Sequence, residues 1–117
     1  MNRLIVSPQA RRDIADILRT SARRFGVAAS RRYHHLITQA QKDLVRDATR
    51  PGVQTRGQLR LYHLRFARNH TKAEQHVGAP RHLLVFRLDS TMIEVVRVLH
   101  DSMDIEAHLE TESGNDN

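Results

Sequence analysis

The sequence predicts an α+β fold, with a small antiparallel β-sheet that carries an N-terminal α-helical hairpin on one face, in the order β-α-α-β-β-β-α. The first observation is that two long amphipathic helix patterns fill the first half of the chain. The second is that the second half changes to strand-like patterns, so helices and strands are segregated. The third is the length of 117 residues, which suits one domain. We expect that domain over residues 1–110 and a polar, disordered tail over residues 111–117.

The N-terminal half begins with a short strand and continues with two helices. Residues 3–6 read Arg-Leu-Ile-Val and predict the strand. Ser7 and Pro8 then predict a helix start, because serine is a favoured N-cap and proline is favoured at the first helical position. Apolar residues follow at helical spacing and form one stripe: Ala10, Ile14, Ile17, Leu18, Ala22 and Phe25.

A glycine separates the two helices of the hairpin. Gly26 suits the position just past a helix end. A second amphipathic pattern runs over about residues 28–48, and Pro51 with Gly52 ends it. Two such helices joined at one glycine predict an antiparallel pair.

The C-terminal half shows three strand-like segments. Residues 59–68 predict a strand that places Tyr62, Leu64 and Phe66 on one face, and residues 82–88 predict another. Residues 92–99 are rich in β-branched side chains, which is typical of a central strand covered on both faces. Arg97 interrupts this last segment, so we expect its side chain to reach a partner or an open rim.

The connecting segments of this half also follow from the sequence. A tight turn is expected over residues 89–91 and a short last helix over residues 104–110. Residues 69–80 form a polar connection of unusual length, and loops of that length in a compact domain are usually functional or disordered. Its histidines, His70 and His76, are expected to be exposed to solvent.

Charge is unevenly distributed along the chain. The formal net charge is +6, yet residues 101–117 hold six acidic residues and no Lys or Arg, which leaves 19 basic against seven acidic residues in the rest. A basic body implies a polyanionic partner: nucleic acid, a nucleoprotein or an acidic protein segment. Seventeen of the basic residues are Arg, whose planar fork pairs with carboxylate or phosphate.

Several classes of protein are excluded by what the sequence lacks. There is no apolar run long enough for a membrane span or a secretory leader, so we expect a cytoplasmic protein. With no Cys, no glycine-rich phosphate loop, no GxSxG and no HExxH, the sequence predicts no cofactor and no metal site. No DNA- or RNA-binding motif occurs and aromatic residues are scarce, so direct sequence-specific nucleic-acid binding is not expected.

Acid–base cleavage of RNA stays open as an alternative. It needs a His or Tyr to move protons and an Arg or Lys to hold the scissile phosphate. Such residue types occur on the predicted strands, where they could equally line a face that docks a partner: Tyr62, His63, Arg65, Arg87, Arg97 and His100.

The most specific segment is the end of the last predicted strand and the residues after it. Residues 95–109 read VVRVLHDSMDIEAHL. This segment strongly resembles the closing strand and tail of ParE-type toxins, within the ParE/RelE toxin superfamily. The opening LIVSPQARRDIADI and the strand RHLLVFRL resemble other parts of that family, so the resemblance covers about residues 3–109. The connection 69–80 is longer than the short hairpin expected of typical members.

The resemblance implies the toxin of a bacterial toxin–antitoxin pair that acts by binding and is not an enzyme. ParE-type members block DNA gyrase, and a ParD-like antitoxin silences them by wrapping its C-terminal segment around the toxin. We therefore expect residues at the strand end and tail to face the target: Arg97, His100, Asp101, Met103 and Asp104. For contact with the antitoxin we expect Arg60, Arg65 and Arg87.

Two other functions remain open at this point. The first is a RelE-like ribosome-dependent mRNA endoribonuclease, in which His100 would donate a proton and Arg97 would hold the phosphate. The second is a pair member that has lost its toxicity and serves as a repressor subunit.

Overall fold

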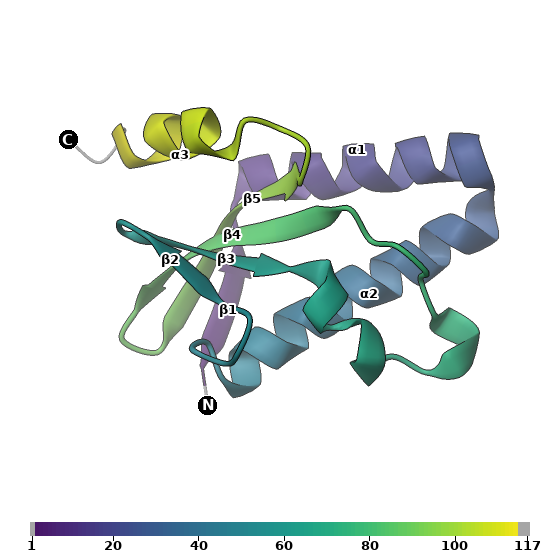
Figure 1. The fold of residues 1–117 in the computed structure, drawn as a ribbon, viewed down its shortest axis with the longest axis horizontal. Helices are drawn as coiled ribbons and strands as arrows, with labels where there is room; N and C mark the ends of the chain where they lie inside the picture. The colour runs from purple at the N-terminus through teal and green to yellow at the C-terminus, as the bar shows by residue number, and fades with distance from the viewer. Residues whose placement is uncertain (1, 115–117) are drawn as a thin grey trace.

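The computed structural model of the chain describes residues 2–114 and shows the predicted α+β fold. Figure 1 shows a helical hairpin on one side of a sheet, with its tip extending past the strands. The helices and strands are β1 (Arg3–Val6), α1 (Pro8–Phe25), α2 (Val27–Arg46), β2 (Gln54–Arg56), β3 (Leu59–His63), β4 (His82–Asp89), β5 (Met92–His100) and α3 (Ile105–Gly114). Both helices of the hairpin lie where the apolar spacing predicts them.

The start of α1 follows from the serine and proline that precede it. Ser7 has an extended backbone and its Oγ accepts a hydrogen bond from the Ala10 N–H at 3.0 Å, while Pro8 occupies the first turn. The Ser7 Oγ–H also donates to the Val96 carbonyl at 3.1 Å, so the cap ties the helix to the sheet. The helix ends at Gly26, whose φ of 96° is open to glycine at little cost.

The sheet has five strands in the order β1-β5-β4-β3-β2. All neighbours are antiparallel except β1 and β5, which run parallel with Arg3 beside Met92 and Val6 beside Val95. The prediction of an antiparallel sheet is therefore corrected to a mixed sheet. A parallel pair needs a connection of a dozen or more residues, and the helical hairpin with β2, β3 and β4 lies between β1 and β5 in the chain.

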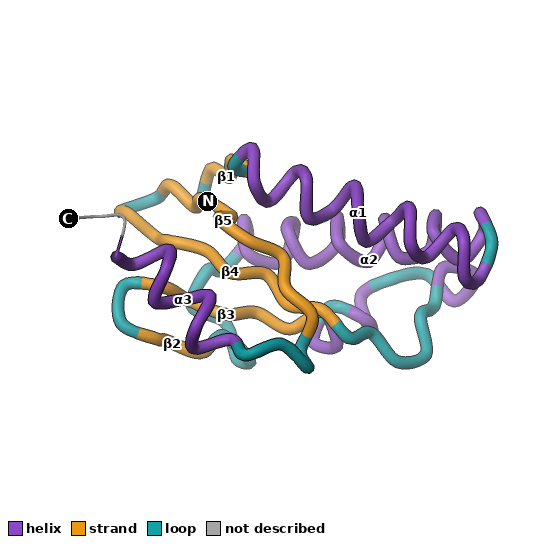
Figure 2. The backbone as a smooth tube through the Cα atoms, turned by 90° about the horizontal axis from the view of Figure 1, so that it is seen from above, coloured by secondary structure: helices purple, strands orange, loops and turns teal. Residues whose placement is uncertain are grey.

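The two faces of the sheet carry separate apolar clusters. The face under α1 and α2 holds the larger one, which includes Tyr62, Phe86 and Ile93 with Leu36 and Leu44 of α2. The opposite face holds six buried strand residues on which Ile105 and Leu109 of α3 pack: Leu59, Leu61, Leu83, Val85, Val96 and Leu99. Figure 2 shows α3 lying along the strands, apart from the α1–α2 hairpin. This double cover explains the nearly continuous apolar character of β4 and β5.

A bulge in β5 explains how the strand accommodates Arg97. Val85 pairs with Arg97 but Phe86 pairs with Val95, so Val96 is an extra residue in β5. Strict alternation from Val95 would place Arg97 in the core under the helices. The bulge gives that core position to Val98 instead, and Val98 belongs to the helix-side cluster.

The strand predicted for residues 59–68 is half as long as expected. β3 ends at His63, and residues 64–66, 68–70 and 73–75 form short 3₁₀ turns. The His63 Nδ1 accepts the Arg65 N–H at 3.1 Å, which turns the chain. Leu64 and Phe66 therefore do not share a strand face with Tyr62 as predicted: Leu64 is buried in the first of these turns, and Phe66 stacks on Tyr62 with ring centroids 5.9 Å apart. The short strand β2 was not predicted, because all three of its residues are polar and exposed.

The C-terminal helix is longer than predicted. It extends to Gly114, over the first part of the expected polar tail, whereas residues 115–117 of that tail lie outside the described residues. Among the described residues, no helix combines the length and the apolar character that a bilayer crossing requires.

The turn after α2 depends on Gly52. Its φ is 100°, and a Cβ built there would lie 2.8 Å from the Phe66 Cγ. We predict that Gly52→Ala lowers the free energy of unfolding by about 2–3 kcal/mol, because left-handed strain adds to a steric clash. Gly57→Ala is the matched control, since Gly57 has φ of 60° with nothing within 4 Å, and it should cost only about 1 kcal/mol. Urea denaturation of both variants checks this, and equal losses would contradict the contact with Phe66.

Candidate functional site

An open groove lies where β5 ends and the helical hairpin begins to overhang the sheet. Its cavity volume is about 690 Å³, and it shares no lining residue with the second cavity described below. We call it the strand-end groove. Its apolar lining includes Ile17, Phe25, Val77 and Met103, and its polar lining includes Arg24, Arg32, Tyr33, Arg81, His82 and His100.

Asp101 organises the chain directly after β5. Its carboxylate accepts hydrogen bonds from the His63 Nε2 at 2.9 Å and from the Arg81 Nε at 2.9 Å. Its N–H donates to the Arg81 carbonyl at 2.8 Å. Partial burial would raise the pKa of Asp101, but the hydrogen bonds from His63 and Arg81 outweigh it and hold this pKa below its usual value. A carboxylate is therefore present at this position at neutral pH.

Backbone donors set the tautomers of two histidines beside Asp101. The His63 Nδ1 accepts the Arg65 N–H, so the proton of the neutral ring is on Nε2, where it can be donated to Asp101. The His100 Nδ1 accepts the Ser102 N–H at 3.0 Å and lies 2.6 Å from the Ser102 Oγ. His100 consequently carries its proton on Nε2 as well.

Tyr33 and His82 form a half-buried polar pair on the wall of the groove. The Tyr33 Oη accepts the Arg81 N–H at 3.1 Å, so its own O–H is donated to the His82 Nδ1, 2.6 Å away. Burial raises the pKa of Tyr33 to about 12. Burial, with the nearby His100 as a smaller cause, lowers the pKa of His82 from 6.5 to about 4, so His82 is neutral at pH 7.

Arg97 is bound to the first helix. Its Nε lies 2.8 Å from the Asp13 Oδ2 and its Nη2 lies 3.2 Å from the Asp13 Oδ1. Asp13 also accepts the Val98 N–H at 2.9 Å, at the point where β1 has ended and the edge of β5 needs a partner. The guanidinium fork of Arg97 therefore fixes α1 to β5, in agreement with the expectation that its side chain reaches a partner.

Met103 and Asp104 lie in the connection between β5 and α3. Met103 is 45% exposed at the rim of the strand-end groove, beside Phe25 on the same lining, which is 72% exposed. Asp104 is at the start of α3, and its Oδ1 accepts the Ala107 N–H at 3.2 Å. Asp104 thus caps the helix, which is a structural use of its carboxylate.

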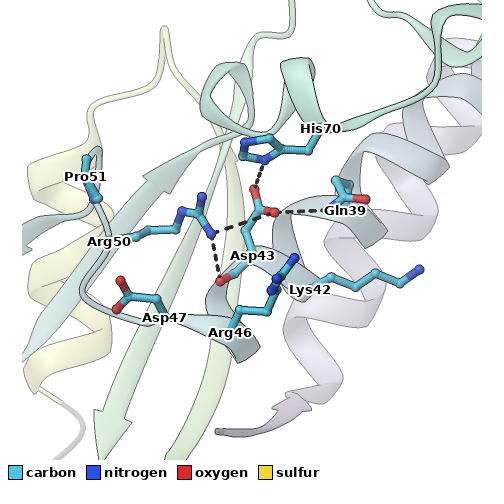
Figure 3. Close-up of a pocket in the computed structure, with 8 residues that line it drawn as sticks. All are labelled: Gln39, Lys42, Asp43, Arg46, Asp47, Arg50, Pro51 and His70. Atoms are coloured by element: carbon cyan, nitrogen blue, oxygen red, sulfur yellow. Dashed lines mark hydrogen bonds and ion pairs between the residues drawn. The ribbon is translucent and has the colours of Figure 1, made fainter.

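A second site lies at the C-terminal end of α2, around a buried carboxylate (Figure 3). The side chain of Asp43 is only 4% exposed. Its Oδ2 accepts hydrogen bonds from the Tyr62 O–H and the His70 Nδ1, both at 2.9 Å. Its Oδ1 accepts the Gln39 Nε2–H at 3.0 Å and lies 3.9 Å from the Arg50 Nη1. Burial and the hydrogen bond to Asp43 both raise the pKa of Tyr62, so the phenol stays protonated as the donor.

Sequence analysis missed Asp43, although a signal was present. Asp43 comes three residues after Ala40 and one before Leu44, so it lies on the apolar stripe of α2. A carboxylate on the buried face of a helix needs partners, and they come from distant parts of the chain. One of them is His70, which is exposed as expected but is also bonded to this carboxylate.

No group of three or more His, Asp or Glu side chains within the described part of the chain is arranged to hold a metal ion.

Comparison with known proteins agrees with this fold. The model of the family described as "ParE toxin of type II toxin-antitoxin system, parDE" matches residues 4–105. The chain belongs to the ParE toxin family. A solved structure titled "Chromosomal ParDE TA system from P. aeruginosa" is similar in fold, with a TM-score of 0.56 and 17% identity over 86% of this chain and 96% of that one. No curated protein matches the chain closely enough to count as a relative.

Membership of the ParE family confirms the resemblance seen in the sequence and places the chain among toxins of type II toxin–antitoxin systems. The ParE family is not a family of catalytic enzymes. Four of the five expected target-facing residues lie at or just after the end of β5: His100 is its last residue, and Asp101, Met103 and Asp104 belong to the connection to α3.

The three arginines expected to contact the antitoxin do not form one surface of this ParE-family chain. Arg60 alternates with Leu59 and Leu61 on β3 and so lies on the helix side of the sheet. Arg87 pairs with Glu94 at 3.7 Å on the face that α3 covers in part. Arg65 is in the 3₁₀ turn after β3, with its guanidinium 4.7 Å from the Phe66 ring centroid.

We predict that Asp43→Asn lowers the free energy of unfolding of this ParE-family chain by about 2–4 kcal/mol, because an amide cannot accept all the hydrogen bonds that Tyr62, His70 and Gln39 donate. Asp47→Asn is the control, since Asp47 is exposed and its carboxylate accepts hydrogen bonds from the neighbouring Thr49. It should cost less than about 1 kcal/mol. Chemical denaturation measures both, and a near-neutral Asp43→Asn variant would refute the role given to this carboxylate.

The lowered pKa of His82 predicts a loss of stability in acid. Between pH 6.5 and about 4 the unfolded chain protonates this histidine while the folded chain does not. Its contribution is therefore complete above pH 6.5 and lost as the pH falls toward 4, by up to about 3 kcal/mol. Urea midpoints between pH 7 and pH 4.5 should fall less steeply in His82→Gln than in the unmodified chain. Identical pH profiles would show that His82 titrates normally.

Proposed function

We propose that this ParE-family protein is a toxin that arrests bacterial growth in the cytoplasm by binding DNA gyrase, and that a ParD-like antitoxin neutralises it. The observation that carries the proposal is the family match over residues 4–105. The excess of basic over acidic residues in residues 1–100 supports it, because gyrase bound to DNA and an acidic antitoxin segment are both polyanionic partners.

We assign gyrase contact to the strand-end groove. Met103 and His100 line it, and Met103 offers an exposed, adaptable apolar side chain. In this proposal the other expected target residues hold the groove in shape. Arg97 binds Asp13 of α1, Asp101 binds His63 and Arg81, and Asp104 caps α3. A binding mechanism needs no proton transfer, and the ring of His100, fixed by the contacts of its Nδ1 with Ser102, can donate from its Nε2–H to the target.

For the antitoxin we keep Arg60, Arg65 and Arg87 as the proposed contacts. Their places on the two faces of the sheet and on the turn after β3 favour an extended partner that passes around the toxin. Carboxylates of such a segment would pair with arginine forks and speed association through charge steering. Binding of this kind neutralises the toxin by covering its surface.

The alternative is a RelE-like ribosome-dependent mRNA endoribonuclease. The specific observation in its favour is that His100, His82, Tyr33 and Arg81 line one groove with the basic residues that RNA would need. Against it stands the pairing of Arg97 with Asp13, because the proposed phosphate clamp would have to break two short charged contacts before it could hold a phosphate.

The proposal is tested with purified gyrase and supercoiled plasmid. We predict that the unmodified chain inhibits supercoiling and that Met103→Ser raises the half-inhibitory concentration by about ten-fold, because a buried apolar contact of the interface is lost. Ile5→Ser is the matched control: Ile5 is 50% exposed, on β1, and is not part of the groove lining. It should leave inhibition unchanged.

Two results would contradict the proposal. If the unmodified chain leaves gyrase active at micromolar concentration, gyrase is not the target. If Ile5→Ser and Met103→Ser weaken inhibition equally while both stay folded by circular dichroism, gyrase is the target but the strand-end groove is not the contact.

A further inference from the structure

The cavity around Asp43 shares no lining residue with the strand-end groove and is not used by the proposed toxin mechanism. We propose that it is a binding site for a phosphate group carried by a nucleotide or by a nucleic-acid backbone. We call it the Asp43 pocket. It is lined by Gln39, Lys42, Asp43, Arg46, Asp47, Arg50, Pro51 and His70.

Cationic donors surround this pocket. Lys42 and Arg46 are one helical turn apart on α2 and exposed, and neither makes an ion pair or a side-chain hydrogen bond within residues 2–109. Arg50 enters from the turn after α2 and uses its Nη1 to donate to the Asp43 carbonyl at 3.1 Å. His70 closes the opposite side with its Nδ1 on Asp43 (Figure 3). Because Asp43 holds Nδ1, the Nε2 of His70 is directed away from that carboxylate.

The two carboxylates of the pocket are already occupied. Both oxygens of Asp43 accept hydrogen bonds from Gln39, Tyr62 and His70. The Oδ1 of Asp47 accepts the Thr49 N–H and O–H, both at 3.0 Å. The carboxylates are therefore held by donors of the protein itself, and the three cations of the lining, Lys42, Arg46 and Arg50, outnumber its two carboxylates.

The end of α2 accounts for only part of this positive charge. The carboxyl-terminal end of a helix carries about half a negative charge, which favours one basic side chain nearby. Arg50, which already donates to a carbonyl of the last turns, meets that preference. Lys42 and Arg46 are therefore positive charges beyond the one that the helix end favours.

The size and donor types of the pocket favour a phosphate ester. Its volume of about 740 Å³ is several times that of a phosphate ion and lies within the usual range for small organic ligands of about 300–1,000 Å³. Arginine binds phosphate through two parallel hydrogen bonds and lysine binds it as a point charge. A phosphate held by Arg46 and Lys42 would leave room for an attached sugar and base.

The test is a titration of the full chain, followed by two-dimensional NMR at constant ionic strength. The probes are inorganic phosphate, a nucleoside monophosphate and a ten-nucleotide single-stranded DNA, with acetate as the control anion. We expect saturable shifts of the amides of α2 and of the turn 47–52 with phosphate compounds and none with acetate. The Lys42→Gln/Arg46→Gln double variant should bind at least about ten-fold more weakly, since each charged hydrogen bond accounts for roughly a five- to ten-fold change.

The matched control is the double variant Arg23→Gln/Arg31→Gln. It removes the same charge from two exposed arginines near the tip of the hairpin that do not line the pocket. It should change the affinity by less than about two-fold. Equal affinity for the monophosphate and the oligonucleotide would identify a nucleotide ligand, and binding of the oligonucleotide alone would identify a nucleic-acid backbone.

The proposal is overturned if no phosphate compound gives saturable shifts up to about 20 mM (roughly ten-thousand-fold above a dissociation constant of about 1 μM). It is also overturned if the two double variants weaken binding equally, which would show attraction to diffuse positive charge. Neither result bears on the toxin mechanism, because the supercoiling assay with Met103→Ser reports on a separate surface.

Discussion

The buried carboxylate of Asp43 joins parts of the chain that are far apart in sequence. Through it α2 is bonded to Tyr62 on β3 and to His70 in the segment after β3, and it comes close to Arg50 in the turn after α2. Burying a charge is unfavourable unless hydrogen bonds and opposite charges replace its water, so α2 can pack on the sheet only when these partners are in place. The long connection between β3 and β4 consequently has a structural role, because it delivers His70 to the carboxylate.

The same principle recurs at the other end of the sheet. Asp13 fixes Arg97 and the edge of β5 to α1, and Asp101 fixes His63 and Arg81 at the end of β5. In a chain with so many arginines, these few aspartates decide which basic side chains serve the fold. Other arginines, such as Arg24 and Arg32 in the lining of the strand-end groove, form no ion pair with an aspartate among the described residues and belong to the basic surface that we propose is offered to a partner. This division connects the composition of the chain with the binding function proposed for it.

Sequence reasoning could predict the parts of the fold that depend on local pattern. The two helices follow from apolar spacing, and the start of α1 follows from Ser7 and Pro8. The strand β4 follows from its apolar run, and β5 follows from its many β-branched residues. It could not predict the features that contacts between distant parts of the chain determine. The strand that begins at Leu59 stops at His63, because the His63 side chain accepts the Arg65 N–H and turns the chain. The polar strand β2 forms because it pairs with β3. The alternation of side chains along β5 does not predict the bulge at Val96. The one indication in the sequence is Arg97, a charged residue within an apolar strand.

Only the part of the candidate site that is contiguous in the chain could be predicted from the sequence. His100, Asp101, Met103 and Asp104 could be proposed because they lie close together in the chain and resemble a family segment, and two of them, His100 and Met103, line the strand-end groove. Tyr33, His82 and Arg81, which complete the strand-end groove, come from two other elements and carry no local signal. For the arginines assigned to the antitoxin, a common surface was expected from the sequence but is not formed. Neighbouring strands of one sheet can present their side chains on different faces, as Arg60 and Arg87 do.

The claim that this ParE-family chain stops growth by binding gyrase is tested most directly by inducing it alone in bacteria. Incorporation of labelled thymidine and of labelled methionine is then followed through the first minutes. The account predicts that thymidine incorporation falls first, and that His100→Ala retains most of this effect. An earlier fall in methionine incorporation that His100→Ala abolishes would contradict it and would point to cleavage of mRNA on the ribosome.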